Sequence, residues 1–127
     1  MNRDHFIELA TPEAVRSVAE KAEKAARLLR EAARDYAPVV FANSFGAEDM
    51  VLTDLIWGRG AEGPDIGIFS LDTGRLPAET YALIASTERH YGRRLEVFYP
   101  ERSSVEAFVG SHGINGFYDS VEARKAC

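Results

Sequence analysis

The sequence predicts an α/β fold: a parallel sheet with helices on both of its faces. Short apolar runs at 39–42, 66–70 and 95–99 are typical of buried strands, and segments with helical spacing alternate with them. Strands that alternate with helices across short loops form βαβ units, whose right-handed crossovers bring the carboxyl ends of the strands to one edge. Ligands of such sheets bind beyond this edge, at a point where the strand order reverses.

The composition indicates one globular domain over residues 1–127. Of the 127 residues, 46% are hydrophobic and 28% are charged, which is enough for a single core. The net charge of -5 argues against non-specific binding to nucleic acid or to an anionic membrane. No apolar run reaches the roughly 20 residues of a membrane span, and residues 1–5 lack the apolar region of a secretory signal. We therefore expect a cytoplasmic protein without a membrane or nucleic-acid partner.

A long amphipathic helix is predicted inside an N-terminal helical segment, residues 1–37. Thr11 suits the N-cap, Pro12 the first helical position and Glu13 the positive end of the helix dipole, while Pro38 prevents continuation into the strand. Small and apolar residues recur three and four positions apart on one face: Val15, Val18, Ala19, Ala22, Ala26, Leu29 and Ala33. The opposite, charged face is interpreted as solvated, with partner binding as the alternative.

The turn after the first strand is the most informative stretch of the chain. Ser44-Phe45-Gly46 interrupts the apolar run, and helical spacing resumes at Met50-Val51 and stops at Gly58. The start of a helix after a tight turn presents unpaired N–H groups and a positive dipole end to an anion. Ser44 adds a hydroxyl donor and Gly46 allows close approach of the backbone, but no Lys follows as in a Walker A loop. The alternative is an ordinary βα corner.

A second turn, Leu71-Asp72-Thr73-Gly74-Arg75, follows the second strand and so belongs to the same sheet edge. Asp72 and Thr73 are candidates for contacting a ribose or a phosphate, although Asp72 is equally suited to an Asx turn. Arg75 is placed to bind a phosphate or sulfate through its planar fork, or else is simply exposed. Because both turns lie at strand ends, one nucleotide-like ligand is expected to touch both.

Three further candidates have ordinary alternatives. Glu48 and Asp49 are candidate metal ligands or acid–base groups, but carboxylates in a first helical turn commonly interact with the dipole. Cys127 is the only cysteine, so the chain has no internal disulfide. The neighbouring Arg124 and Lys125 favour its thiolate, which indicates a reactive thiol or simply an exposed one.

Later elements are predicted from local signals. Pro77 begins a helix that Gly92 ends as a left-handed cap, and Pro100 stops the third strand. Ser103 and Glu106 have the spacing of a capping box, which predicts a short helix ending by Gly110 or Gly113. A turn at 114–119 then leads into a final helical run.

Taken together and in this order, these motifs resemble the sulfonucleotide reductase family, the adenylyl-sulfate and phosphoadenylyl-sulfate reductases. The Leu-Asp-Thr-Gly segment followed by Pro-x-Glu-Thr-Tyr is the most specific of them. The matching stretches are Ser44–Asp49, Leu71–Tyr81, Val97–Pro100, Asn115–Ser120 and Arg124–Cys127.

The resemblance implies an adenine-nucleotide α-hydrolase-like, Rossmann-like fold. The first turn would be the family's modified pyrophosphatase loop around the phosphosulfate, and the second would line the nucleotide pocket. The substrate-binding residues so implied are Ser44, Phe45, Gly46, Ala47, Glu48, Asp49, Leu71, Asp72, Thr73, Gly74 and Arg75. In this family, a cysteine attacks the sulfur of adenylyl sulfate to give S-sulfocysteine and AMP, and thioredoxin or glutaredoxin thiols then release sulfite.

Two departures from the family pattern set expectations for this chain. The nucleophilic cysteine belongs to a C-terminal tail that these 127 residues do not contain. The adenylyl-sulfate branch also holds a 4Fe-4S cluster through four cysteines, of which Cys127 aligns with the first. We therefore expect the N-terminal part of a longer adenylyl-sulfate reductase, a truncated sheet, and a chain that by itself has no catalytic residue and binds no cluster.

Several alternatives stay open. A phosphoadenylyl-sulfate reductase would have to bind an additional 3′-phosphate. An ATP pyrophosphatase of the same fold would need a Ser-Gly-Gly-x-Asp-Ser loop, which Phe45 and Glu48 do not fit. A non-catalytic nucleotide-binding module is the third. Because a truncated sheet exposes apolar surface and an unpaired edge, we also expect association, with a homo-oligomer in the parent protein.

Overall fold

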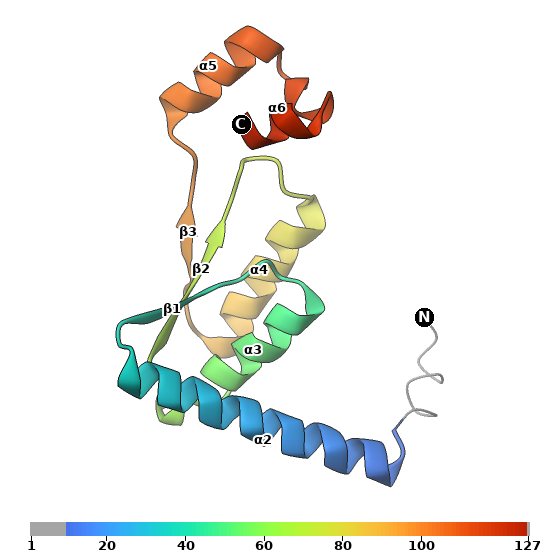
Figure 1. Ribbon diagram of the computed structural model, residues 1–127, viewed down its shortest axis with the longest axis vertical. Helices are drawn as coiled ribbons and strands as arrows, with labels where there is room; N and C mark the ends of the chain where they lie inside the picture. The colour runs from blue at the N-terminus through green and yellow to red at the C-terminus, as the bar shows by residue number, and fades with distance from the viewer. Residues whose placement is uncertain (1–9, 127) are drawn as a thin grey trace.

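The computed structural model describes residues 10–126 and confirms the α/β fold. Three parallel strands, β1 (Val39–Ala42), β2 (Ile66–Leu71) and β3 (Glu96–Phe98), form one sheet in the order β1-β2-β3, flanked by helices (Figure 1). The carboxyl ends of the strands share one edge, as predicted. Within these residues the strands lie side by side in the same order as in the sequence, so the predicted reversal of strand order is not found in the part of the chain described. Residues 1–9 of the predicted segment 1–37 lie outside that part.

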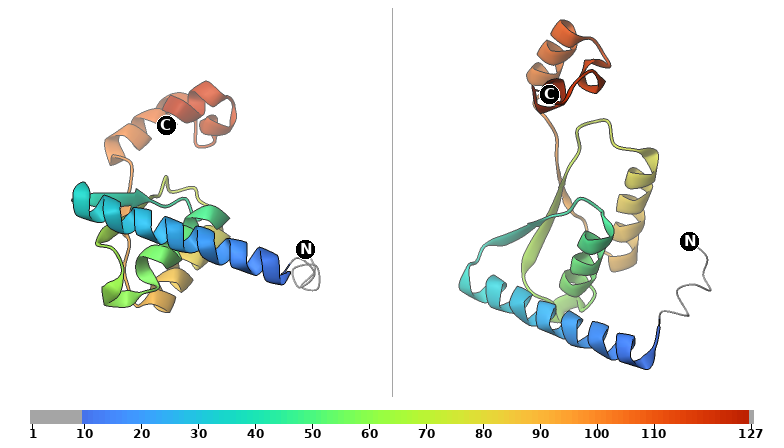
Figure 2. Two further views of the ribbon diagram at one scale, coloured as in Figure 1. Left: turned by 60° about the horizontal axis from the view of Figure 1, so that its bottom comes forward. Right: turned by 45° about the vertical axis from the view of Figure 1, so that its right-hand side comes forward.

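The helix α2 (Pro12–Asp35) begins and ends where the sequence predicts. Thr11 is the N-cap, and its hydroxyl accepts a hydrogen bond from the N–H of Ala14 at 3.1 Å. Leu29 and Ala33, in the C-terminal half of the helix, pack against the core. The N-terminal half extends away from the sheet (Figures 1 and 2).

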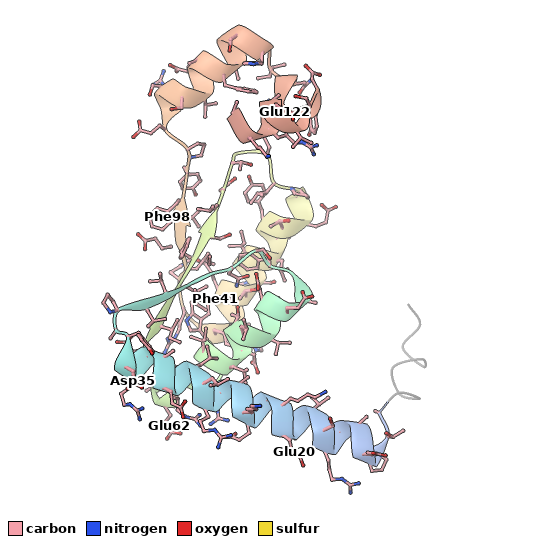
Figure 3. The ribbon with its side chains drawn as sticks, in the orientation of Figure 1. Glu20, Asp35, Phe41, Glu62, Phe98 and Glu122 are labelled. Carbon is pink, nitrogen blue, oxygen red and sulfur yellow. The ribbon has the colours of Figure 1, made fainter. Side chains whose placement is uncertain are left out.

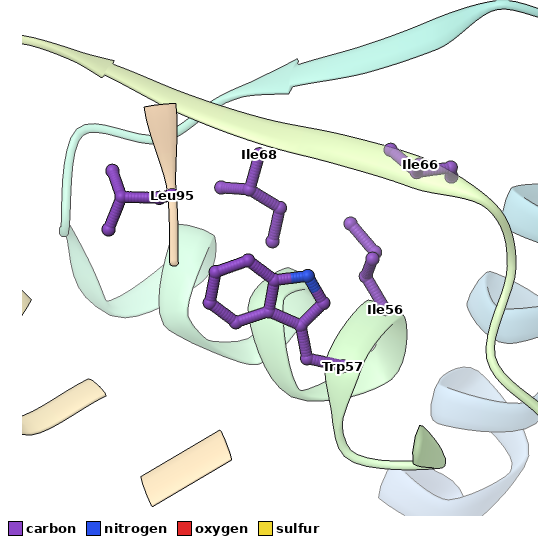
Figure 4. Packing of buried hydrophobic residues seen from close by; sticks show 5 residues of the cluster. All are labelled: Ile56, Trp57, Ile66, Ile68 and Leu95. Atoms are coloured by element: carbon purple, nitrogen blue, oxygen red, sulfur yellow. The ribbon is translucent and has the colours of Figure 1, made fainter. Parts of the chain in front are cut away.

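The core lies between one face of the sheet and the helices α3 (Ala47–Trp57) and α4 (Ala78–Tyr91). Its buried members are Ile56, Trp57, Ile66, Ile68 and Leu95 (Figure 4). The Trp57 ring meets the Tyr91 ring edge-on, with centroids 5.9 Å apart. Burial of each large side chain contributes about 1.5–3 kcal/mol, so this cluster is what holds the strands against the helices.

The opposite face of the sheet is apolar and exposed. Exposure alternates along β2, as expected for a strand whose two faces differ. On the exposed face, Val40 is 65% accessible, Leu71 62% and Phe98 48%. Figure 3 labels Phe98 on β3. The region described therefore has one packed sheet face and one exposed apolar sheet face.

Two of the later local signals are confirmed and one is wrong. Gly92 ends α4 in the left-handed conformation, with φ 62°, and Gly113 follows the last residue of α5 (Arg102–His112). The predicted capping box does not form. The N-cap is Glu101, Ser103 is already helical, and Glu106 instead accepts a hydrogen bond from Arg102 at 2.6 Å.

Residues 102–126 form a helical lobe beyond the carboxyl edge of the sheet (Figures 1 and 2). It consists of α5, the 3-10 turn η2 (Gly116–Tyr118) and α6 (Val121–Ala126), and residues 99–101 connect it to β3. Phe108 is buried inside the lobe, with the His112 ring stacked on it at a centroid distance of 4.5 Å.

A second 3-10 turn, η1 (Gly60–Glu62), lies in the glycine-rich loop after α3. Within residues 10–126, no helix is long and apolar enough to cross a membrane.

Candidate ligand site at the carboxyl edge of the sheet

The first turn closes on itself through Ser44 and Asp49. The backbone N–H and the hydroxyl of Ser44 both donate to Oδ2 of Asp49, each at 2.7 Å. The N–H of Gly46, the N-cap of α3, donates to the Ser44 hydroxyl at 3.3 Å. These bonds hold the turn against the start of α3.

The same contacts lower the pKa of Asp49 below its usual value, first through the Ser44 hydroxyl and then through the Ser44 N–H. The carboxylate is therefore charged near neutral pH. It accepts from the Ser44 hydroxyl, which the sequence analysis assigned to an anionic ligand, and also from the Ser44 N–H. The N–H groups of the first turn of α3 have no acceptor within the helix. They are the donors that remain for an anion at this position.

Asn43, which sequence reasoning missed, joins three elements of the site. It is 4% exposed, and its side-chain amide donates to Thr53 Oγ1 at 2.8 Å while its Oδ1 accepts from the N–H of Phe45 at 2.7 Å. Its carbonyl accepts from the Ser70 hydroxyl at 2.8 Å. The signal in the sequence is a polar amide directly continuing an apolar strand, since a buried polar group needs partners.

Phe45, rather than a glycine, adopts the left-handed conformation in this turn, with φ 63°. Such a conformation is uncommon for an aromatic residue and costs on the order of 1–3 kcal/mol. The bond from its N–H to Asn43 and the packing of its ring against the core hold it there. Ala47 and Glu48 are exposed in the first turn of α3.

The second turn forms the Asx turn that the sequence left as an alternative. Oδ1 of Asp72, which is 8% exposed, accepts from the N–H of Gly74 at 2.7 Å and from the Tyr81 hydroxyl at 2.8 Å. The bond to Asp72 raises the pKa of Tyr81. Gly74 is left-handed, with φ 79°, a conformation that glycine adopts without strain. Leu71 and Thr73 are exposed beside them.

Arg75 contacts the helical lobe. Its Nη1 donates to Oδ1 of Asn115 at 3.1 Å, its Nη2 donates to the carbonyl of Ile114, and its guanidinium lies 4.3 Å from the centroid of the Phe117 ring. Arg75 is exposed, as one of the two predicted alternatives has it, but neither alternative included these contacts with the lobe.

Two cavities lie at the carboxyl edge. The first, of about 290 Å³, is lined by one residue from each predicted turn, Ser44 and Leu71. The others are Ala42, Asn43, Phe69, Ser70, Leu76 and Thr80. The second, of about 310 Å³, lies between the second turn and the lobe, and Thr73 and Arg75 line it. The edge geometry thus brings the two turns together at one cavity, while Thr73 and Arg75 line the neighbouring one.

The part of the chain that the structure describes contains no grouped set of metal ligands. Among residues 10–126, no three His, Cys, Asp or Glu side chains are grouped to hold a metal ion. The chain has a single cysteine, Cys127, which lies outside the described residues. A 4Fe-4S cluster takes about four thiolates, so this chain's own residues do not supply a complete ligand set.

Comparison with known families identifies the fold. Residues 38–127, which include both turns and the helical lobe, match the family model of the phosphoadenosine phosphosulfate reductase domain. The chain belongs to this family.

The curated relatives are named adenosine 5'-phosphosulfate reductases. A relative from Allochromatium vinosum is 50% identical over 103 residues, covering 81% of this chain and 39% of the relative. One from Burkholderia cepacia is 44% identical over 117 residues, covering 92% of this chain and 44% of the relative. One from Sinorhizobium fredii is 42% identical over 118 residues, covering 93% and 45%. The chain therefore spans less than half the length of these three relatives.

Proposed function

We propose that this chain is the nucleotide-binding, N-terminal part of an adenylyl-sulfate reductase. The observation that carries the proposal is the cavity of about 290 Å³ to which both turns contribute at the carboxyl edge of a parallel sheet. The names of the relatives indicate the substrate, and the family membership indicates the reaction class.

The two turns have different roles in this proposal. The phosphosulfate lies at the start of α3, where the free N–H groups and the helix dipole favour negative charge. Asn43 holds the first turn, residues 44–49, through its hydrogen bonds to Phe45 in the turn and to Thr53 in α3. The second turn, residues 71–75, lines the nucleoside end, because Leu71 borders the same cavity.

The proposed reaction reduces sulfur by two electrons. A cysteine thiolate outside these 127 residues attacks the sulfur of adenylyl sulfate, the bond from sulfur to the phosphate oxygen breaks, and AMP leaves with that electron pair. A thiol of thioredoxin or glutaredoxin then attacks Sγ of the resulting S-sulfocysteine, and sulfite leaves with the electron pair of the broken S–S bond. A second thiol of the same partner resolves the mixed disulfide, which releases the enzyme cysteine and leaves the partner oxidised to a disulfide. This chain's residues bind and orient the substrate. By itself the chain is proposed to be inactive.

The parent protein is further proposed to hold a 4Fe-4S cluster with Cys127 as one of four ligands, to be a homo-oligomer and to be cytoplasmic, where thiols stay reduced. The iron content of the parent protein tests the first point. Cys127→Ser is expected to lower iron and inorganic sulfide per protein, and unchanged values would remove Cys127 from the ligand set.

Calorimetric titration of the chain with adenylyl sulfate, AMP and ATP tests the site. We expect adenylyl sulfate and AMP to bind. Ser44→Ala should weaken binding about tenfold, because it removes the bond from the Ser44 hydroxyl to the charged Asp49 that holds the first turn against the start of α3, and such a bond is worth about 1.5–3 kcal/mol. Ser104→Ala is the matched control, since Ser104 is exposed in the helical lobe. A folded chain with unchanged affinity after Ser44→Ala would contradict the assignment of the first turn.

A phosphoadenylyl-sulfate reductase is the second candidate, because the matching family model carries that name. Such an enzyme must bind a 3′-phosphate as well. Including 3′-phosphoadenylyl sulfate in the titration distinguishes the two substrates: tighter binding of the 3′-phosphorylated nucleotide would favour this candidate over the first.

A further inference from the structure

Within residues 10–126, the helical lobe has few hydrogen bonds to the sheet and the helices packed on it. Among residues 10–126, the hydrogen bonds between the lobe, residues 102–126, and the preceding residues of the sheet body are the two that Arg75 donates to Asn115 and Ile114. Apart from these, residues 99–101 link the two parts covalently. Within these residues, Arg75 is therefore the one side chain through which the body donates hydrogen bonds to the lobe.

Arg75 is suited to this role by shape. Two nitrogens of one planar fork bond two neighbouring acceptors, the Asn115 amide oxygen and the Ile114 carbonyl, while the guanidinium lies 4.3 Å from the Phe117 ring centroid. A lysine has neither the fork nor the plane, so it cannot make this set of contacts.

A cavity lies beside Arg75, between the second turn and the lobe. A cavity of about 310 Å³ separates the second turn from the lobe, and the lobe contributes apolar side chains such as Val105, Val109 and Ile114 to its wall. Where the cavity lies, body and lobe are not in direct contact. The Arg75 contacts bridge the two parts at the rim of this cavity.

We propose that Arg75 is a positioning residue that holds the helical lobe, residues 102–126, against the carboxyl edge of the sheet. The inference stands whether or not the proposed reductase function is correct, because it concerns the attachment of the lobe and no ligand. It gives Arg75 a role in the protein's own architecture that is distinct from binding an anion.

Hydrogen–deuterium exchange read peptide by peptide tests this role. The lobe's longest helix has 11 residues, and isolated helices this short are marginal in water. A released lobe will therefore unfold and exchange faster. We expect Arg75→Ala to speed exchange across 105–126 at least about tenfold, because both hydrogen bonds that Arg75 donates to the lobe are lost. Exchange in peptides covering 39–57, which include β1 and α3, should be unchanged, and this result would show that the body remains folded.

Arg94→Ala is the matched control. Arg94 is also an arginine that pairs with a neighbour, but its partner Glu88 lies in the body, and the Arg94 side chain is 86% exposed. It should leave the lobe's exchange unchanged. Arg75→Lys should behave like Arg75→Ala, since charge alone does not replace the fork. Unchanged exchange in Arg75→Ala, an equal effect from Arg94→Ala, or full protection in Arg75→Lys would each overturn the proposal.

Two further readouts separate positioning from general stabilisation. Added ethylguanidinium should restore protection to the lobe of Arg75→Ala, whereas urea at the same concentration should not. Asn115→Ala should speed exchange in the otherwise unaltered protein and add little once Arg75 is already alanine, because the two side chains share one bond. Additive effects, or absence of rescue, would contradict a direct attachment. If Arg75→Ala does not fold, Asn115→Ala alone decides: unchanged exchange across 105–126 in this variant would overturn the proposal.

Discussion

At the scale of single residues, the Ser44–Asp49 pair makes stability depend on pH. The pKa of Asp49 lies below its ordinary value of 3.8 in the folded chain, so the pair stabilises the fold above pH 3.8 and loses this effect as the pH falls through the lowered pKa. Asp49→Asn is expected to lower the urea midpoint of unfolding at pH 7. The difference from the unaltered chain should shrink as the pH falls below 3.8.

Glu48→Gln is the control for this titration, because Glu48 precedes Asp49 in the same helical turn and is exposed. It should change the midpoint less, since the interaction of an exposed carboxylate with a helix dipole is worth about 0.3–1 kcal/mol and is screened by salt. A midpoint difference for Asp49→Asn that stays constant down to acid pH would show that the carboxylate charge is not the cause.

Residue-level prediction from the sequence succeeded where the signal is local. The Thr11 cap, the left-handed Gly92 and the Asx turn at Asp72 each depend on neighbours within four residues, and each is found. Asn43 and Arg75 were not predicted in their observed roles. Ser70, which bonds Asn43, is 27 residues away, and Asn115, which bonds Arg75, is 40 residues away, so no local pattern reveals either contact.

At the scale of elements, competing local signals decide where a helix begins. Ser103 and Glu106 match a capping box, yet α5 begins two residues earlier than this box predicts, with Glu101 as N-cap and with Arg102 and Glu106 paired at helical spacing. Strand positions were easier to predict. Apolar runs identified β1 and β2 within about a residue, and their order placed both turns at one edge. That deduction depends only on parallel topology.

Two glycines of the helical lobe give an element-scale prediction. Gly110 lies inside α5 with open space where a side chain would be, so Gly110→Ala should raise stability by about 0.5–1 kcal/mol, because alanine loses less backbone entropy. At Gly116, an added Cβ would lie 2.5 Å from Cβ of His112. Gly116→Ala should therefore loosen the lobe. Hydrogen–deuterium exchange of α5 measures both, and equal effects of the two substitutions would contradict the packing described.

At the scale of the whole molecule, the packed and exposed sheet faces predict self-association. Val40, Leu71 and Phe98 leave an apolar surface on one face, and β1 has no strand beyond it within residues 10–126. Apolar patches beside an unpaired strand edge favour pairing between chains. We therefore expect the sedimentation coefficient of the 127-residue chain to rise with concentration.

Lysine substitution identifies the surface responsible. Val40 is 65% exposed on β1 and Val18 is 64% exposed on α2, so the two valines are matched in accessibility and differ in location. Val40→Lys should shift the chain toward monomer, because a charge on an edge strand opposes pairing. Val18→Lys should leave association unchanged. If only Val18→Lys shifted the chain toward monomer, association would be assigned to the N-terminal half of α2. If the unsubstituted chain were a monomer at every concentration, the exposed sheet face would not drive self-association.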